Sequence, residues 1–224
     1  MHIYIFAPHP DDEVFGAGGS ILKWLENGHE IYIIWLTDGR AGYRKARKLG
    51  ELEDNEETRI TEDQLAEKRL AEAAASAKIL GVKPENCYYL KIHDRDLMNH
   101  KYDVIDQLIR FIKKVDRFVI PSNNNEHPDH QATYEIAVRV AEKLNLKDIE
   151  FYVYAIHTPL KAKGERLVKV RFGNLRYKAL EALKEHRSQF YLKDLELQSK
   201  WVESKRRDYF GLYKLGDKGK HFNF

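Results

Sequence analysis

Residues 2–36, HIYIFAPHPDDEVFGAGGSILKWLENGHEIYIIWL, contain the pattern that decides the fold. The aromatic and β-branched run at 2–7 predicts a buried strand that ends at Pro8, and the run at 30–36 predicts a second strand. Between these two runs, the spacing of apolar residues predicts a helix over 14–27. A strand, a helix and a strand in this order are typical of a parallel sheet that is covered by helices.

The same alternation continues along the rest of the chain. Further helices are predicted at 62–80, 102–115, 129–143, 174–189 and 199–212, and further strands at 87–91, 117–120 and 150–156. Continuous apolar strands of this kind are buried on both faces. We therefore predict a Rossmann-like α/β fold, with a mostly parallel sheet flanked by helices on both faces, and a single domain over residues 1–224 because no repeat or Ser- or Pro-rich linker interrupts the chain.

The composition excludes several classes of protein. The 38 Lys and Arg residues and 35 Asp and Glu residues give a net charge of +3, and the two signs are interspersed, which disfavours a nucleic-acid binder. The single cysteine, Cys87, excludes a disulfide framework and a Cys-rich zinc site, and it fits the reducing cytoplasm. No apolar stretch approaches the roughly 18 residues that a membrane span needs. The heavy use of Lys and Glu is also a feature of heat-adapted proteins.

One segment, RKARKLGELEDNEETR at residues 44–59, is almost entirely charged or small. We expect a solvated loop or an exposed helix here. Because the segment follows the carboxyl end of a predicted strand, a flap over the edge of the sheet is the alternative.

Two predicted loops concentrate the chemically reactive residues. PHPDDE at 8–13 follows the first strand, and NNNEHPDH at 123–130 follows the strand predicted at 117–120. Ligands of open α/β sheets bind outside the carboxyl ends of the strands, so both loops belong to the edge where a site is expected. A single histidine in such a loop is usually an ordinary hydrogen-bonded residue, but three histidines and several acids together predict a site.

The chemistry that suits this set of residues is hydrolysis at a metal ion. Catalytic zinc takes three ligands from His and carboxylate side chains and keeps one position open for water. Two histidines and one acid of these loops would supply the ligands, and a second carboxylate would accept a proton from the water. A remaining histidine, if protonated, would donate to a developing oxyanion.

His9-Pro10-Asp11-Asp12-Glu13 together with His127-Pro128-Asp129-His130 resembles the signature of the PIG-L/LmbE-like deacetylases, zinc enzymes that remove N-acetyl groups from glucosamine derivatives. Lesser motifs of the family follow in the same order: Leu36-Thr37-Asp38-Gly39, Arg69-x-x-Glu72, Asp94 with Leu97, and Lys178 with Ser188-Gln189. The resemblance spans residues 2 to about 190. It implies a catalytic core over about 1–190, followed by a C-terminal tail over about 191–224 that the apolar pattern predicts to be helical.

The resemblance also implies roles for individual residues. It implies three zinc ligands: His9, Asp12 and His130. Asp11 would be the general base that activates the water, and His127 would stabilise the oxyanion and protonate the leaving amine. Three further residues would support the site or contact the substrate: Asp129, Arg69 and Asp94. Asp129 would orient a neighbouring histidine. Arg69 and Asp94 would contact sugar hydroxyls or an anionic group, with a structural ion pair as the alternative.

Other features carry less information. Some mycothiol-type relatives have a tyrosine where this chain has Asn125, so a role for that tyrosine does not transfer. The glycines of residues 16–19 do not complete a dinucleotide-binding fingerprint, because the third glycine would fall at Ile21. They are expected to let the helix approach the sheet closely. His186 has no cluster of reactive residues around it in the sequence.

We therefore predict a cytoplasmic zinc-dependent hydrolase that removes the N-acetyl group from a small molecule containing glucosamine. The alternatives are an amidase acting on a different acyl group of an amino sugar, a metal-dependent phosphoesterase, and a binding relative without activity. A phosphoesterase would more often show extra carboxylates for a second metal. The oligomeric state stays open, and a homo-oligomer is one alternative.

Overall fold

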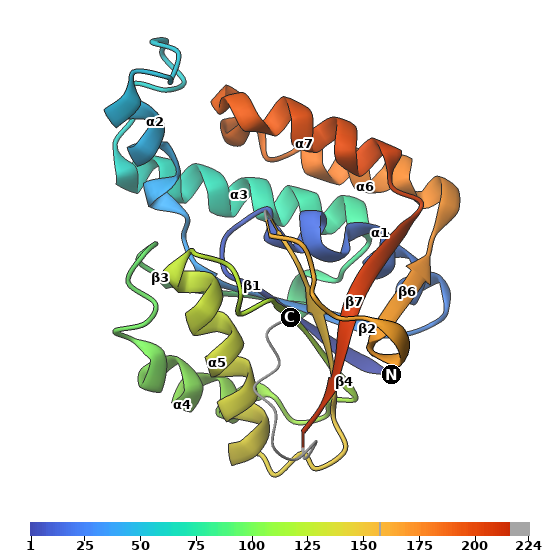
Figure 1. The fold of residues 1–224 in the computed structure, drawn as a ribbon. Helices are drawn as coiled ribbons and strands as arrows, with labels where there is room; N and C mark the ends of the chain where they lie inside the picture. Colours follow the sequence, from blue (N-terminus) through green and yellow to red (C-terminus); the bar gives the residue numbers. More distant parts are fainter. Residues whose placement is uncertain (157, 216–224) are drawn as a thin grey trace.

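The structure is a computed structural model that describes residues 1–156 and 158–215, with the backbone alone for residues 193–198. The described strands are β1 His2–Ala7, β2 Glu30–Thr37, β3 Cys87–Ile92, β4 Arg117–Pro121, β5 Glu150–Tyr154, β6 Leu167–Arg171 and β7 Arg207–Lys214. They form one sheet in the order β3-β2-β1-β4-β5-β7-β6 (Figure 1). The first five strands in this order are parallel, and β7 runs antiparallel to both β5 and β6.

Helices cover both faces of the sheet, as the sequence predicts. The described α-helices are α1 Asp12–Glu26, α2 Arg44–Leu49, α3 Glu62–Leu80, α4 Lys101–Phe111, α5 Pro128–Lys143, α6 Arg176–Lys184 and α7 Lys193–Ser204. Helices α1, α3, α6 and α7 lie on one face, and α4 and α5 lie on the other (Figure 1). The alternating residues of β1 show why its apolar run is continuous: Ile3 and Ile5 join the core under α1, whereas Tyr4 and Phe6 join the core under α5.

Local sequence signals set the ends of the helices. Thr61 and Gln64 form a capping box at the start of α3, and Gly81 ends that helix in the left-handed conformation, with φ of 88°. The predicted bounds of this helix, 62–80, are therefore correct. The helix predicted at 102–115 is too long, because the backbone becomes extended at Ile112.

The small residues of α1 allow it to lie close to the sheet. A Cβ atom on Gly16 would be 2.5 Å from Cδ2 of Tyr154 in β5, and one on Gly19 would be 2.4 Å from the ring of Phe172. No side chain larger than hydrogen fits at either position without displacing an aromatic ring. These glycines therefore serve helix packing, as expected, and they fix the distance between the start of α1 and the end of β5.

The prediction of a helix over 199–212 is wrong, and so is that of a helical tail over about 191–224 as far as residue 215; residues 216–224 lie outside the described residues. Helix α7 ends at Ser204, and Arg207–Lys214 forms β7, which fills the gap between β5 and β6. Asp208 and Phe210 are buried while Tyr209 between them is exposed, which is the alternation of a strand. The helical interpretation failed because β5 offers a long-range pairing partner that local periodicity does not reveal. The sequence analysis also did not predict strand β6, whose pairing partner is β7.

The charged segment at 44–59 is exposed. It begins with α2, which buries none of its residues, and continues as turns in which Thr58 is buried. This matches an exposed helix followed by a loop, and the alternative of a flap over the site stays a prediction.

Candidate metal centre

The two loops with reactive residues meet because their strands are neighbours. Strands β1 and β4 pair in parallel, with Ile5 opposite Val119, so their carboxyl ends lie side by side. The loop after β1 leads into α1, and the loop after β4 leads into α5. Both loops therefore end at a helix N-terminus at the same edge of the sheet, where the sequence predicts the site.

His9, Asp12 and His130 lie together in this edge. Nδ1 of His9 is 3.1 Å from Oδ2 of Asp12, and Nε2 of His130 is 3.4 Å from the same oxygen. The three side chains are largely buried, and one potential ligand atom from each lies within 4.8 Å of the others. Two imidazole nitrogens and one carboxylate oxygen are the donors that catalytic zinc takes, with a fourth position left for water. The group can hold a metal ion.

The charges of the group suit a cation. Burial opposes the ionisation of Asp12, but the imidazoles of His130 and His9 outweigh this effect and hold the pKa of Asp12 well below its usual range. For His9, burial opposes the charged form and lowers the pKa. The carboxylates of Asp94, Asp12 and Asp129 raise it by more, so the pKa of His9 lies well above its usual value. A metal ion bound by His9 would displace this proton, which makes metal binding dependent on pH.

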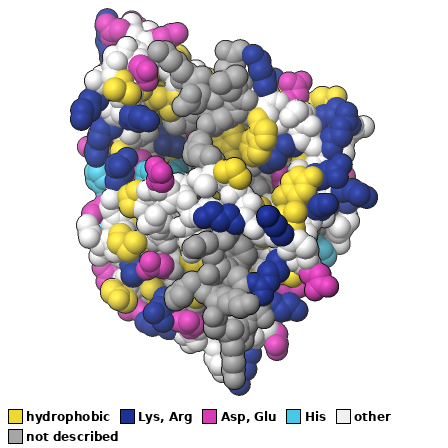
Figure 2. Space-filling model, in the orientation of Figure 1, with side chains coloured by type: hydrophobic (Ala, Val, Ile, Leu, Met, Phe, Trp, Pro, Cys, Tyr) yellow, Lys and Arg dark blue, Asp and Glu magenta, His cyan; other side chains and the backbone are white. Residues whose placement is uncertain are grey.

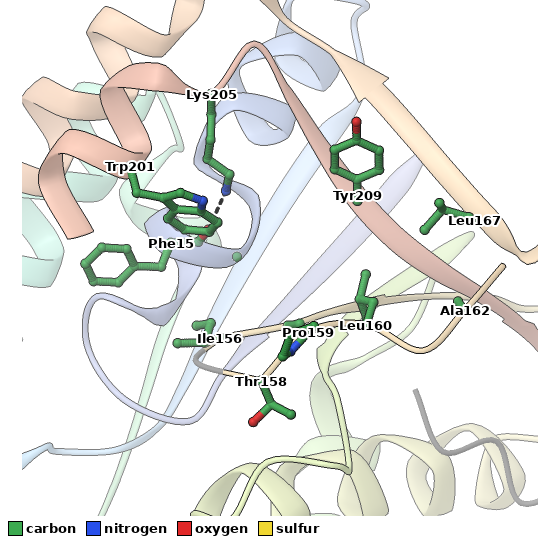
Figure 3. Close-up of a pocket in the computed structure, with 12 residues that line it drawn as sticks. Phe15, Ile156, Thr158, Pro159, Leu160, Ala162, Leu167, Trp201, Lys205 and Tyr209 are labelled. Atoms are coloured by element: carbon green, nitrogen blue, oxygen red, sulfur yellow. Dashed lines mark hydrogen bonds between the residues drawn. The ribbon is translucent and has the colours of Figure 1, made fainter. Parts of the chain in front are cut away.

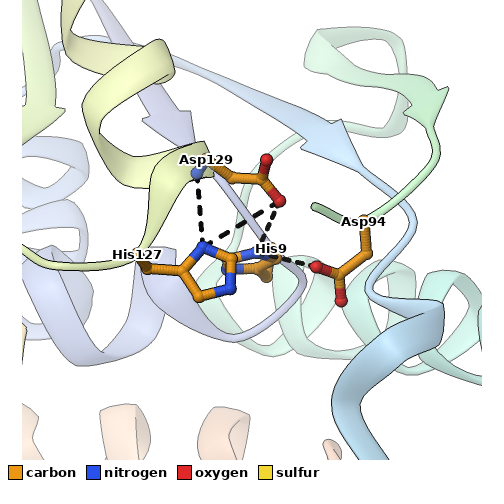
Figure 4. Close-up of side chains that lie close together, drawn as sticks. All are labelled: His9, Asp94, His127 and Asp129. Carbon is orange, nitrogen blue, oxygen red and sulfur yellow. Dashed lines mark hydrogen bonds and ion pairs between the residues drawn. The ribbon is translucent and has the colours of Figure 1, made fainter. Parts of the chain in front are cut away.

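A second group of acids surrounds the other nitrogen of His9. Nε2 of His9 lies 3.3 Å from Oδ2 of Asp129 and 3.4 Å from Oδ1 of Asp94 (Figure 4). Asp129 is fully buried, and its two oxygens also accept hydrogen bonds from the backbone N–H groups of Arg95 and Leu97, at 2.6 and 3.3 Å. These contacts orient the His9 ring so that Nδ1 faces Asp12.

Asp11 stands beside the metal-binding group in an unusual conformation. Its backbone φ of 117° lies in a region that residues other than glycine rarely adopt. Its backbone N–H donates a hydrogen bond to Oε2 of Glu13 at 3.1 Å. Oδ2 of Asp11 accepts a hydrogen bond from Arg69 at 3.1 Å. Burial raises the pKa of Asp11 to about 7, assisted by the charge of Asp12 and opposed by Arg69. A carboxyl group with this pKa is suited to accept a proton near neutral pH.

Arg69 holds the loops in place. One of its terminal nitrogens donates to the carbonyl oxygen of Gly39 at 2.8 Å, and the other donates to the carbonyl oxygen of Pro10 at 2.6 Å. The side chain is 5% exposed. Both terminal nitrogens are thus used inside the protein, which favours the structural ion pair over the substrate contact for this residue. Asp94 likewise accepts a hydrogen bond from the backbone of Ala41 at 3.1 Å.

His127 is the N-cap of α5, and its position determines its tautomer. Nδ1 of its ring accepts a hydrogen bond from the backbone N–H of Asp129 at 3.3 Å, which leaves the proton of the neutral ring on Nε2. Burial lowers the pKa of His127 to about 4, and the nearby ring of His9 adds to the effect. The neutral ring can still donate a hydrogen bond from Nε2, so donation to an oxyanion does not require the protonated form assumed from the sequence.

The structure shows a cluster that the sequence analysis missed. His186 is fully buried, and its Nε2 lies 3.3 Å from Oε1 of Glu13. The other oxygen of Glu13 accepts a hydrogen bond from Nε1 of Trp35 at 2.8 Å. Burial lowers the pKa of His186, but the carboxylate of Glu13 beside it outweighs this effect and raises the pKa above its usual value. The interpretation that His186 has no reactive neighbours is wrong.

A signal for His186 was present in the sequence. It lies two residues before Ser188-Gln189, a segment that the family resemblance had already singled out. The backbone N–H and the hydroxyl of Ser188 donate to the carboxylate of Glu72 at 2.8 and 2.6 Å. Within the Arg69-x-x-Glu72 motif, Glu72 thus holds the segment around Ser188 in place, and Arg69 holds the loop that contains Asp11.

The fold and this site define an α/β protein with a buried His/Asp group that can hold a metal ion. The chain belongs to the PIG-L family, because the family model described as GlcNAc-PI de-N-acetylase matches residues 4–141. It is 30% identical to the "Probable N-acetyl-alpha-D-glucosaminyl L-malate deacetylase 2" of Bacillus anthracis, over 98% of each chain. It is 32% identical to the diacetylchitobiose deacetylase of Thermococcus kodakarensis, over 55% of this chain and 43% of that protein.

A solved structure has the same fold. The N,N'-diacetylchitobiose deacetylase of Pyrococcus horikoshii matches 95% of this chain and 84% of its own chain, with a TM-score of 0.73 and 24% identity. The mostly parallel sheet with helices on both faces is therefore confirmed. Among the residues that the structure describes, no helix is both long enough and apolar enough to cross a membrane.

Proposed function

We propose that this protein is a zinc-dependent hydrolase that removes the N-acetyl group from a small molecule containing glucosamine and releases acetate. The observation that carries the proposal is the buried group of His9, Asp12 and His130, with the carboxyl group of Asp11 beside it. The names of the relatives from Bacillus anthracis and Thermococcus kodakarensis, both deacetylases of N-acetylglucosamine compounds, support the class of substrate.

In this proposal, His9, Asp12 and His130 hold the zinc ion. When bound, zinc would polarise the acetyl carbonyl and lower the pKa of a water molecule. Asp11 accepts the proton of the attacking water, and the Arg69 ion pair holds its carboxylate in position. Asp129 keeps His9 in the orientation that presents Nδ1 to the site. His127 donates a hydrogen bond from its neutral Nε2–H to the developing oxyanion, and the proton that Asp11 has taken from the water passes to the leaving amine.

The alternatives are less well supported. A phosphoesterase with two metals would need a second ligand set, and the other group near the site, formed by His9, Asp94, His127 and Asp129, shares His9 with the first. Both oxygens of Asp129 already accept hydrogen bonds from backbone N–H groups. An amidase that cleaves a different acyl group would use the same residues. A relative without activity would lack the base or a ligand, and each of these positions is filled in this chain.

Three further proposals concern the molecule in the cell. We infer a cytoplasmic location from the single cysteine. We infer a single domain over residues 1–224, because β6 and β7 from the second half extend the sheet that β1 and β2 begin. We also infer function at high temperature from the abundant Lys and Glu residues.

The requirement for metal can be tested by removing and restoring it. Protein stripped with a chelator should release no acetate from N-acetylglucosamine compounds, and about one equivalent of zinc per chain should restore the release. Full activity of the stripped protein, with its metal content measured as zero, would contradict the proposal.

A further inference from the structure

A pocket of about 690 Å³ lies between α1, the segment that follows β5, the end of α7 and strands β6 and β7 (Figure 3). Its walls are mostly apolar, and the larger side chains that line it are Phe15, Ile156, Leu160, Leu167, Trp201 and Tyr209. Figure 2 shows hydrophobic side chains gathered on the face of the molecule that carries α7 and β7. The volume lies in the range of pockets that bind small molecules.

The described residues that line the pocket leave no charge unpaired. Lys205 is the only charged side chain among the described residues that line it. Its Nζ donates to the carbonyl oxygen of Phe15 at 2.9 Å, lies 2.9 Å from the carboxylate of Asp208, and stands over the ring of Trp201. The charge of Lys205 is therefore already compensated. An uncharged apolar group fits these walls better than a carboxylate or a phosphate does.

The pocket and the candidate metal centre are both built on helix α1. Phe15 and Gly16 of the pocket follow Asp12 by three and four residues on α1, so they share one face of that helix with the candidate ligand. The side chain of Asn125 links the two sites from the opposite side: its Nδ2 donates to the carbonyl oxygen of Ile156 at 2.8 Å, and its Oδ1 accepts from the backbone N–H of His127 at 2.9 Å.

We propose that this pocket binds an uncharged alkyl or aryl aglycone, the group attached to the amino sugar whose acetamide is hydrolysed at the metal centre. The inference rests on the proposed deacetylase function and specifies its substrate. It sets this chain apart from the Bacillus anthracis relative, whose name gives malate as the aglycone. Malate is a dicarboxylate, and the described lining residues offer no uncompensated cation to pair with it.

The first test compares two substrates that differ only in the aglycone, methyl and octyl N-acetyl-β-D-glucosaminide, by acetate release from the zinc-loaded enzyme. Each methylene that enters an apolar site strengthens binding roughly fourfold, so a KM for the octyl compound at least about tenfold lower is a modest expectation. Leu160→Asp, which puts a charge into the wall, should reduce this preference. Tyr102→Ala, which changes a residue of α4 that is 72% exposed and outside the pocket, should leave it intact. Equal KM values for the two compounds in the wild type would overturn the proposal.

The second test does not depend on catalysis. Trp201 is 47% exposed, whereas Trp24 and Trp35 are buried, so the tryptophan emission that responds to an apolar ligand in the pocket comes from Trp201. Octyl glucoside, below its micelle-forming concentration, should shift the emission of the Asp11→Asn variant to shorter wavelength, and methyl glucoside should not. The shift should be lost when Trp201→Phe is added. If the emission does not shift, or if the shift persists after Trp201 is replaced, the proposal that this pocket binds an apolar aglycone is overturned.

The two tests separate the failure of the inference from the failure of the proposed function. Acetate release from both glycosides with equal KM values would support the deacetylase function and overturn the proposal that the pocket binds the aglycone. An emission shift that depends on Trp201, without acetate release from either glycoside or from a panel of other N-acetylglucosamine compounds, would support the apolar site and overturn the deacetylase function.

Discussion

At the scale of single residues, the most unusual group is Asp11, a buried carboxyl with a pKa raised to about 7 from its ordinary value of 3.8. Between these two values the folded protein binds a proton that the unfolded chain does not bind, so the metal-free protein loses stability as the pH rises from about 4 to about 7. Above pH 7, the ionised carboxylate of Asp11 therefore lowers the stability of the metal-free protein, and a metal ion nearby would offset this loss.

Asp11→Asn should consequently stabilise the metal-free protein at alkaline pH. We expect a gain of about 1–3 kcal/mol at pH 8 that disappears near pH 4, because Asn keeps the shape of the side chain and removes its ionisation. Thermal unfolding of both proteins with a chelator present, across this pH range, measures the difference. A variant less stable than the wild type at pH 8 would show that the ion pair with Arg69 outweighs the cost of burial.

The proposed ligand set makes its own prediction. His130→Ala removes one of three zinc ligands and should lower zinc affinity by at least about 100-fold, since the two remaining ligands do not complete a site. His100→Ala, a change at a half-exposed histidine before α4, is the control. Metal content after dialysis against a competing chelator is the measurement, and equal zinc content in His130→Ala and the control would refute the ligand set.

The residues of the site differ in how far the sequence could predict them. His9, Asp11 and Asp12 are adjacent in the chain, and their juxtaposition with His130 follows from the pairing of two parallel strands. The contact between Glu13 and His186 depends on where the segment after α6 packs, which no local pattern determines. The substrate role suggested for Arg69 was likewise undecidable without knowing that both its terminal nitrogens bind backbone carbonyls.

At the scale of elements, the position of α1 couples the core to the site, because this helix starts with Asp12 and contacts Tyr154 through Gly16. Gly16→Ala places a methyl group 2.5 Å from the Tyr154 ring and should cost about 1–3 kcal/mol of stability. Gly18→Ala is the matched control: its nearest neighbour is the end of the Val14 side chain at 3.1 Å, and alanine favours the helix. Chemical denaturation measures both, and equal stability of the two variants would contradict the packing argument.

The elements also show which patterns predict structure well. The parallel strands β1, β2 and β4 are buried on both faces, so their continuous apolar runs are visible in the sequence. Strand β6 lies at the edge of the sheet and buries none of its residues, and β7 beside it mixes buried, half-buried and exposed residues. Segments with such mixed burial are compatible with a helix or a strand, and long-range pairing of β7 with β5, and of β6 with β7, determines that they are strands.

At the scale of the whole molecule, β7 joins the C-terminal segment to the parallel sheet. Its Phe210 is fully buried beside Trp24 and Tyr152, and its Asp208 accepts hydrogen bonds from the backbone and hydroxyl of Ser20 in α1. Phe210→Ala should therefore destabilise the protein by about 3–5 kcal/mol. Tyr209→Ala, on the exposed face of the same strand, should cost much less, and equal losses in denaturant unfolding would argue against the pairing of β7.

The central claim is that Asp11 acts as the base of a metal-dependent deacetylase, and acetate release by the zinc-loaded protein tests it most directly. The wild type should release acetate and a free amine in equal amounts from at least one compound in a panel of N-acetylglucosamine derivatives. Asp11→Asn should keep its zinc and release no acetate above the background. Acetate release by zinc-loaded Asp11→Asn at the rate of the wild type, or none by the zinc-loaded wild type from any compound, would contradict the account.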